Sequence, residues 1–129
     1  MNLSFSNLCA QAYYQAKISP NAQYVANATA NRIVIRRSSM DLSIVNVFEC
    51  LKPVDYIQWS PNSECILAAN YESSRIEVHS IIDPKWTATI KDLAFPFASV
   101  QWTVDSKNII TVSQMNVKDL STFPQPVCN

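Results

Sequence analysis

Short runs of alternating apolar and polar residues recur along the chain and predict β-strands. The run RIVIRR at residues 32–37 and the run RIEVHS at residues 75–80 alternate with a period of two, because successive side chains of a half-buried strand point to opposite faces. Polar links connect them to two further strand-like runs, SIVNVFEC at residues 43–50 and WTATI at residues 86–90. No segment sustains a helical period. These patterns predict an all-β chain.

The strands belong to a repeated unit. Its hydroxyl anchors, Ser19, Ser60 and Thr103, are 41 and 43 residues apart. An apolar or aromatic residue stands near each anchor, a polar turn follows it, and an apolar strand comes next. The three copies align without a gap, and they are KISPNAQYVA at residues 17–26, QWSPNSECIL at residues 58–67 and QWTVDSKNII at residues 101–110. With the strands downstream, each unit supplies about four short strands.

Four strands in a unit of roughly 40–45 residues is the period of a WD-repeat β-propeller blade. The turn after each hydroxyl is similar to the Ser-Pro-Asp-Gly turn of such blades. Asn21 and Asn62 stand at its Asp position. Ala22, Ser63 and Ser106 stand at its Gly position, in a chain that contains no glycine. We therefore predict a partial propeller with two complete four-stranded WD-type blades and an incomplete third, whose turns use Asn, Asp and Ser in place of glycine.

The Trp-Asp position at the end of the third strand of a regular blade is occupied differently here. The first repeat carries Arg36-Arg37 at this position, and the second carries His79-Ser80. No Gly-His dipeptide begins any blade. We therefore expect the usual Ser-His-Asp-Trp hydrogen-bond network of regular blades to be mostly missing.

The order of these motifs resembles the amino-terminal blades of a divergent WD-repeat family that is associated with centrosomes, centriolar satellites and spindle poles. The resemblance covers residues 1 to about 116 and rests mainly on four short motifs. They are Cys9, Cys50-Leu51, Ile57-Gln58-Trp59-Ser60 and Tyr71. It implies a non-enzymatic scaffold for protein–protein interactions. It also implies microtubule anchoring, spindle assembly, cilium formation and a coiled-coil centriolar-satellite protein as partner.

The repeats divide the chain into a partial propeller at residues 1–116 and a divergent tail at residues 117–129. The expected blades lie at about residues 10–50, 51–92 and 93–116. Pro124 and Pro126 cannot donate ladder hydrogen bonds, which argues against a central strand in the tail. We interpret the tail as belonging to a shortened isoform or an incomplete gene model, and we expect the isolated chain to be marginally stable and to self-associate or require missing blades.

Charge is balanced over the whole chain but uneven along it. Ten basic residues match ten acidic ones, so the composition indicates no nucleic-acid partner. Four bases and no acid fall within residues 1–40, which leaves six bases against ten acids in the remainder. Arg32, Arg36 and Arg37 form the candidate protein-binding set. A solvated strand edge is the alternative interpretation of this set, and an acidic protein patch or tubulin tail is the partner that it would bind.

Candidate chemistry is sparse. His79, Ser80 and Asp83 imitate a catalytic triad in composition, but adjacent residues of a strand point to opposite faces. Four cysteines at positions 9, 50, 65 and 128 form no CxxC pair, and His79 is the single histidine. We therefore assign no catalytic residue, no cofactor and no metal site, and we expect the chain not to be an enzyme.

Trp59 and Trp102 stand at equivalent positions of their repeats. We expect them to pack between blades rather than to bind a ligand. The amino-terminal segment lacks the basic region of a signal peptide, and no stretch is long enough for an apolar membrane span. These features predict a cytoplasmic protein, and the resemblance places it at the centrosome and cytoskeleton. The alternative function is a propeller module of a larger enzyme, such as a propeller-bearing peptidase, whose catalytic domain is absent here.

Overall fold

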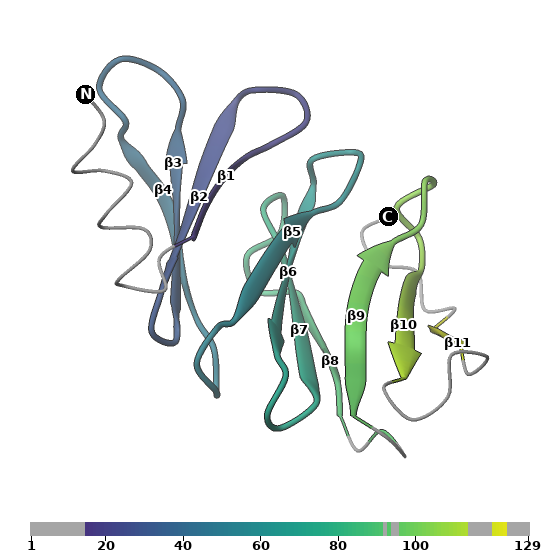
Figure 1. Ribbon diagram of the computed structural model, residues 1–129. Helices are drawn as coiled ribbons and strands as arrows, with labels where there is room; N and C mark the ends of the chain where they lie inside the picture. The colour runs from purple at the N-terminus through teal and green to yellow at the C-terminus, as the bar shows by residue number, and fades with distance from the viewer. Residues whose placement is uncertain (1–14, 92, 94–95, 114–119, 124–129) are drawn as a thin grey trace, which may run out of the picture.

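The computed structural model describes residues 15–91, 93, 96–113 and 120–123. These residues form three antiparallel sheets that lie side by side in the order of the chain (Figure 1). Each sheet is a meander in which strands that are consecutive in sequence are neighbours in space. No helix occurs among the described residues. The chain is thus an all-β partial propeller, as the repeat predicts.

The sheets are called blades below, and their strands alternate in direction. The first blade contains β1 (Gln15–Ile18), β2 (Tyr24–Thr29), β3 (Arg32–Arg37) and β4 (Ile44–Glu49). The second blade contains β5 (Tyr56–Trp59), β6 (Cys65–Asn70), β7 (Arg75–Ser80) and β8 (Thr87–Ile90). The third blade contains β9 (Phe97–Trp102), β10 (Ile109–Ser113) and β11 (Leu120–Phe123). Two blades are therefore four-stranded, and the third shows three strands among the described residues.

Two apolar clusters fill the seams between the blades. The first joins Ala26, Ala28, Ile33, Ile35 and Phe48 of the first blade to Ile57, Trp59, Ile66 and Ala68 of the second. The second joins Leu67, Ala69, Ile76 and Val78 of the second blade to Phe97, Val100, Trp102 and Ile109 of the third. The middle blade therefore buries both of its faces. This burial explains why β6 and β7 are buried almost throughout, although β7 alternates in polarity.

The turn between the first two strands of each blade has the same hydrogen bonds in all three repeats. In the second blade, the hydroxyl of Ser60 donates to Asn62 Oδ1 at 2.7 Å and accepts the amide of Cys65 at 3.0 Å. Asn62 Oδ1 also accepts the amide of Glu64 at 3.1 Å. The turns at Ser19 and Thr103 repeat these three bonds. The hydroxyl and the following Asn or Asp therefore hold the turn without glycine.

The residue at the glycine position of each turn has a left-handed backbone. Its φ angle is 63° at Ala22 and 65° at both Ser63 and Ser106. A residue with a Cβ atom meets a steric cost in this region, which glycine avoids. The prediction that other residues take the place of glycine in these turns is confirmed, and each turn carries this local strain.

The last strand, β11, lies within the segment that we interpret as a tail. It pairs with β10 and is the edge strand of the third sheet among the described residues. The rest of the interval 114–129 lies outside the described residues, as do residues 1–14, which hold Cys9 of the resemblance. Among the described residues, no helix is long and apolar enough to cross a membrane.

Candidate functional site at the seam between the first two blades

Each seam contains a tryptophan that is hydrogen-bonded to the preceding blade. Trp59 Nε1 donates to the carbonyl of Lys17 at 3.1 Å, and Trp102 Nε1 donates to the carbonyl of Gln58, also at 3.1 Å. Both indoles are buried, with 6% and 4% exposure. Trp59 further stacks on Tyr24 of the first blade, with ring centroids 6.1 Å apart. The prediction that these tryptophans pack between blades is confirmed.

The strained turns add a second repeated bond across the seams. The amide of Asn21 donates to Ser63 Oγ at 3.0 Å, and the amide of Asn62 donates to Ser106 Oγ at 3.0 Å. Serine at the glycine position thus supplies an acceptor to the turn of the preceding blade. Glycine could not do so, because it has no side chain. Ser63 and Ser106 therefore each have a strained backbone conformation and accept a hydrogen bond from the preceding blade.

The innermost strands of the first two blades are joined by one side chain. Gln15 Oε1 accepts the amide of Ile57 at 3.0 Å, and Gln15 Nε2 donates to the carbonyl of Asp55. The carboxamide therefore occupies the edge of β5 as a neighbouring peptide group would. Close by, the Lys17 ammonium lies 4.8 Å from the centre of the Tyr56 ring.

The link after β4 is fixed against both blades, and it places Cys50 in the first seam. The amide of Cys50 donates to the carbonyl of Asn31 at 2.7 Å, and Asn31 Nδ2 donates back to the carbonyl of Cys50 at 3.1 Å. Asn70 of the second blade donates to the carbonyl of Pro53 at 2.8 Å. Cys50 is a buried free thiol. Its position is therefore set by backbone bonds on both sides of the seam.

Glu77 and His79 face this thiol from the second blade. They are two residues apart on β7, so both point to the face that packs on the first blade. His79 Nε2 lies 3.8 Å from Cys50 Sγ and 3.3 Å from Glu77 Oε1. The imidazole stacks on Phe48 of the first blade, with centroids 4.8 Å apart. A compact group, called the seam cluster below, is formed by the Cys50 thiol, the Glu77 carboxylate and the His79 imidazole. Its sulfur, carboxylate oxygen and ring nitrogen lie within 4.8 Å of one another.

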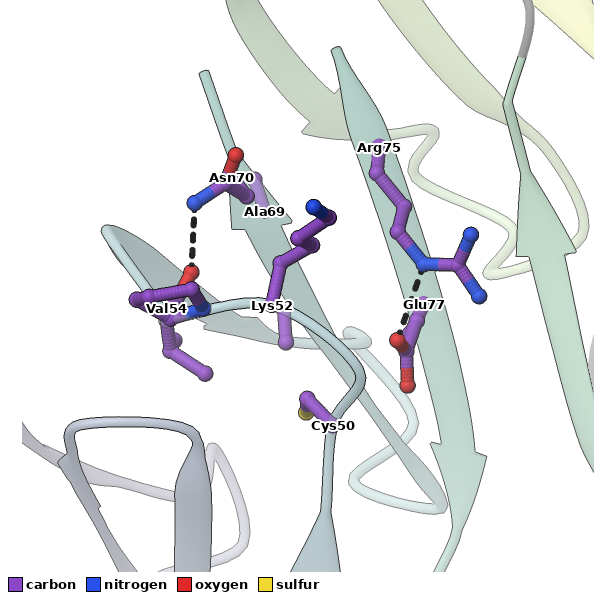
Figure 2. A pocket seen from close by; sticks show the side chains of 9 residues that line it. Cys50, Lys52, Val54, Ala69, Asn70, Arg75 and Glu77 are labelled. Atoms are coloured by element: carbon purple, nitrogen blue, oxygen red, sulfur yellow. Dashed lines mark hydrogen bonds and ion pairs between the residues drawn. The ribbon is translucent and has the colours of Figure 1, made fainter. Parts of the chain in front are cut away.

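Hydrogen bonds orient the Glu77 carboxylate. Its Oε2 accepts the amide of Leu51 at 2.9 Å. The same oxygen accepts Arg75 Nε at 3.1 Å (Figure 2). The other oxygen, Oε1, is directed to His79. Burial raises the pKa of Glu77, but the bonds from Leu51 and Arg75 and the nearby His79 lower it more, so the pKa lies below its usual value of 4.5. Glu77 is therefore a carboxylate at neutral pH, although its side chain is only 10% exposed.

Burial is the main cause of the pKa shifts of the other two groups of the seam cluster. It raises the pKa of the Cys50 thiol to about 12, and the Glu77 carboxylate acts in the same direction. Burial also lowers the pKa of His79 below 6.5, and the attraction of Glu77 offsets only part of that shift. At neutral pH the thiol is therefore protonated and the imidazole is neutral. The contact between His79 and Glu77 is then a hydrogen bond to a carboxylate rather than a full ion pair.

A hollow opens beside the seam cluster. Its empty volume is about 170 Å³, and Cys50 and Glu77 form part of its wall together with Lys52, Val54 and Asn70 (Figure 2). In the close view, Cys50 lies on the link from the first blade and Glu77 on a strand of the second. The hollow therefore gives solvent a route toward two of the three groups.

The structure separates the three arginines of the candidate protein-binding set. Arg32 pairs with Glu49 at 3.0 Å in an exposed bridge at the end of the sheet. Arg36 is half-buried on the outer face of the first blade, with its Nη1 3.5 Å from Asn27 Oδ1. Arg37 is exposed. Arg32 and Arg36 share one face through the period of two, but they do not form a single cluster with Arg37.

The residues of the apparent triad have separate local partners. His79 faces the first blade, whereas Ser80 Oγ accepts the amide of Asp83 at 2.9 Å. The Asp83 carboxylate accepts the amide of Lys85 at 3.3 Å. These contacts are those of a strand end and the turn that follows it.

Sequence reasoning missed Cys50 and Glu77 as members of a site. The pair Glu77 and His79 could be found from their spacing, because residues two apart on a strand share a face. Cys50 could not, because its approach to His79 depends on how two blades pack. His79 is the single histidine of the sequence, and spacing alone gives it no partners that complete a site.

Comparison with known proteins agrees with the repeat. The chain is 28% identical over 102 residues to the WD repeat-containing protein WRAP73 of Mus musculus. The match covers 79% of this chain and 22% of that protein, so the chain spans about a fifth of the length of the relative. No protein-family model matches the chain. This similarity supports a WD-repeat protein.

Proposed function

We propose that this chain forms part of a non-enzymatic WD-repeat scaffold that mediates protein–protein interactions. The observation that carries the proposal is the repeated seam, in which Trp59 and Trp102 make the same interblade bond. Such seams stack blades into a rigid array whose faces and loops are available to other proteins. The similarity to a WD repeat-containing protein supports the same role.

The resemblance of the amino-terminal motifs extends the proposal to a cellular setting. The chain acts in the cytoplasm at the centrosome, the spindle pole and the cytoskeleton, where the scaffold anchors microtubules and serves cilium assembly. Its partner is a coiled-coil centriolar-satellite protein. The support for these functions is the resemblance of the amino-terminal blades, and no particular binding site is assigned to them.

Arg32, Arg36 and Arg37 are the proposed contacts with an acidic partner surface. They supply three positive charges on one strand, β3, and Arg37 is exposed. The exposed bridge from Arg32 to Glu49 contributes little to folding, because exposed ion pairs are screened by solvent. Arg32 can therefore exchange its partner at small cost.

The test is capture of the coiled-coil satellite protein by the whole chain. We expect the triple variant with Arg32→Glu, Arg36→Glu and Arg37→Glu to lose most of the capture, and a second triple variant with Gln at these positions to show an intermediate loss. The matched control reverses three exposed lysines, Lys85, Lys91 and Lys107, and should leave capture unchanged.

Circular dichroism and an unfolding curve of each variant separate loss of binding from loss of folding. Unchanged capture by a folded triple Glu variant would reject the three arginines as contacts. Absence of any capture by the unmodified chain would reject the satellite partner for these blades.

A further inference from the structure

The seam cluster, besides its hydrogen bonds, brings together donor atoms of the types that metal sites use. It offers one sulfur, one imidazole nitrogen and one carboxylate oxygen, each from a different side chain. Zn²⁺ binds these three donor types, with metal–ligand distances of about 2.3 Å to sulfur and about 2.0–2.2 Å to nitrogen and oxygen. We propose that Cys50, Glu77 and His79 bind a thiophilic divalent cation such as Zn²⁺ across the seam between the first two blades.

The distances in the cluster fit the edges of a tetrahedron around such an ion. Tetrahedral bonds of the usual lengths place a sulfur and a nitrogen ligand about 3.6 Å apart, and a nitrogen and an oxygen ligand about 3.3 Å apart. The observed separations are 3.8 Å from Cys50 Sγ to His79 Nε2 and 3.3 Å from His79 Nε2 to Glu77 Oε1. The third edge, between Cys50 Sγ and the Glu77 carboxylate, lies within 4.8 Å and would have to close to about 3.6 Å when one ion is bound.

Surrounding groups already hold two ligands in position. The amide of Leu51 and the guanidinium of Arg75 both bind Glu77 Oε2, which leaves Oε1 for the ion. The ring of His79 is held against Phe48. Such outer contacts orient metal ligands and limit the entropy that binding costs.

Charge balance favours a divalent ion. The Cys50 thiol releases its proton to solvent when its sulfur binds the metal, while Glu77 is already a carboxylate and His79 binds through a neutral nitrogen. Two negative ligands then match the two positive charges of the ion, and Arg75, which stays paired with Glu77 Oε2, leaves one positive charge beside the site. Sulfur and imidazole donors favour Zn²⁺ over Ca²⁺ and Mg²⁺, which prefer oxygen.

The hollow supplies the remaining coordination position. It borders Cys50 and Glu77 and opens to solvent. A water molecule can therefore complete the tetrahedron. Because Cys50 comes from the link after the first blade and the other ligands come from β7, the ion would join two blades. This inference goes beyond the proposed scaffold function and does not depend on any partner.

The experiment titrates the chelator-treated whole chain with Zn²⁺ and measures the heat of binding. We expect one Zn²⁺ per chain. The variants Cys50→Ser and His79→Gln should each lower the affinity for Zn²⁺ by at least about 100-fold. Loss of a residue that only supports a metal ligand already lowers metal affinity about 10- to 100-fold. Lys52→Ala, at the rim of the same hollow, is the matched control and should bind as the unmodified chain does.

Two readouts distinguish a specific site from binding elsewhere. Zn²⁺ should raise the unfolding midpoint of the unmodified chain and leave that of Cys50→Ser unchanged. Cobalt(II) should give a sulfur-to-metal charge-transfer band of the strength of one thiolate, and this band should vanish in Cys50→Ser. If Cys50→Ser and His79→Gln both fail to fold, the isosteric variant Glu77→Gln takes their place and should weaken Zn²⁺ binding and change the cobalt spectrum. Absence of the charge-transfer band, or Zn²⁺ affinity that survives in both folded ligand variants, would overturn the proposal.

Discussion

The indole nitrogen of Trp59 donates a hydrogen bond to the carbonyl oxygen of Lys17 in the innermost strand of the preceding blade. The ring that carries this nitrogen is buried in the seam and stacks on Tyr24. One side chain therefore combines apolar burial with a polar contact that aligns two inner strands. The equivalent bond of Trp102 shows that this relationship belongs to the repeat rather than to one position.

Truncation of Trp59 should destabilise the chain strongly. We expect Trp59→Ala to cost about 3–5 kcal/mol, because it opens a cavity in the seam and leaves the Lys17 carbonyl without its donor. Trp59→Phe should retain most of the packing and cost about 1 kcal/mol through the lost hydrogen bond. Arg36→Ala is the surface comparison and should change stability by no more than about 0.5 kcal/mol. Denaturant unfolding measures all three, and equal midpoints for Trp59→Ala and Arg36→Ala would contradict the packing role.

The strained turns predict opposite effects at two equivalent positions. Ala22→Gly should stabilise the chain by about 1 kcal/mol, because glycine adopts the φ of 63° without a steric cost. Ser63→Ala keeps the strain and removes the acceptor for the Asn21 amide, so it should destabilise by about 1 kcal/mol.

Thermal unfolding compares these variants with Ala16→Gly, a replacement in an exposed strand position. This control should be destabilising, because glycine has a larger conformational entropy to lose. A stabilising Ala16→Gly would show that the gain at Ala22 does not come from its backbone conformation.

The seam cluster predicts that acid weakens the metal-free chain. The pKa values of His79 and Glu77 are both lower in the folded chain than their usual 6.5 and 4.5. In each case the unfolded state binds the proton more tightly, so stability is fully present above the usual pKa and is lost as the pH falls through the folded value. The His79 contribution should begin to fall below about pH 6.5, and the Glu77 contribution below about pH 4.5.

Urea unfolding between pH 8 and pH 4 in the presence of a chelator measures this dependence. The groups that face His79 are the Cys50 thiol on the link, Glu77 on β7 and, behind Glu77, Arg75. His79→Gln should flatten the part of the profile between neutrality and about pH 5. An unmodified chain that is equally stable at pH 7 and pH 5 would contradict the assignment.

The outer face of the first blade predicts self-association. Pairing places Ile18, Val25, Val34 and Val47 on the face opposite the first apolar cluster. Ile18 and Val47 are 66% and 48% exposed. A sheet face of this kind exposes apolar surface that another blade or a second chain can cover.

Light scattering across a range of concentrations should therefore detect association of the isolated chain. The double variant Ile18→Ser with Val47→Thr should shift the chain toward the monomer. Val104→Thr changes an equally apolar side chain that is 93% exposed on a turn outside this face, and it should leave association unchanged. A monodisperse monomer with one cooperative transition and several kcal/mol of stability would show that the array folds independently.

The local architecture could be predicted from the sequence because its causes are local. The alternation in residues 32–37 and 75–80 predicts the strands β3 and β7, and the spacing of Ser19, Ser60 and Thr103 predicts the repeat. The turn bonds join residues within about five positions of one another, so the order of hydroxyl, Asn or Asp, and small residue is enough to specify them.

The seam was decided by tertiary structure. Trp59 reaches Lys17 across 42 residues, and Cys50 reaches His79 across 29. No periodicity encodes these contacts, because they depend on the twist of each sheet and on the side chains that fill the space between two blades. The sequence by itself therefore determined four-stranded units, their strained turns and the buried role of the tryptophans. Only the packing of one blade on the next brought a thiol, a carboxylate and an imidazole together, since groups on separate sheets meet only when their apolar faces exclude water between them.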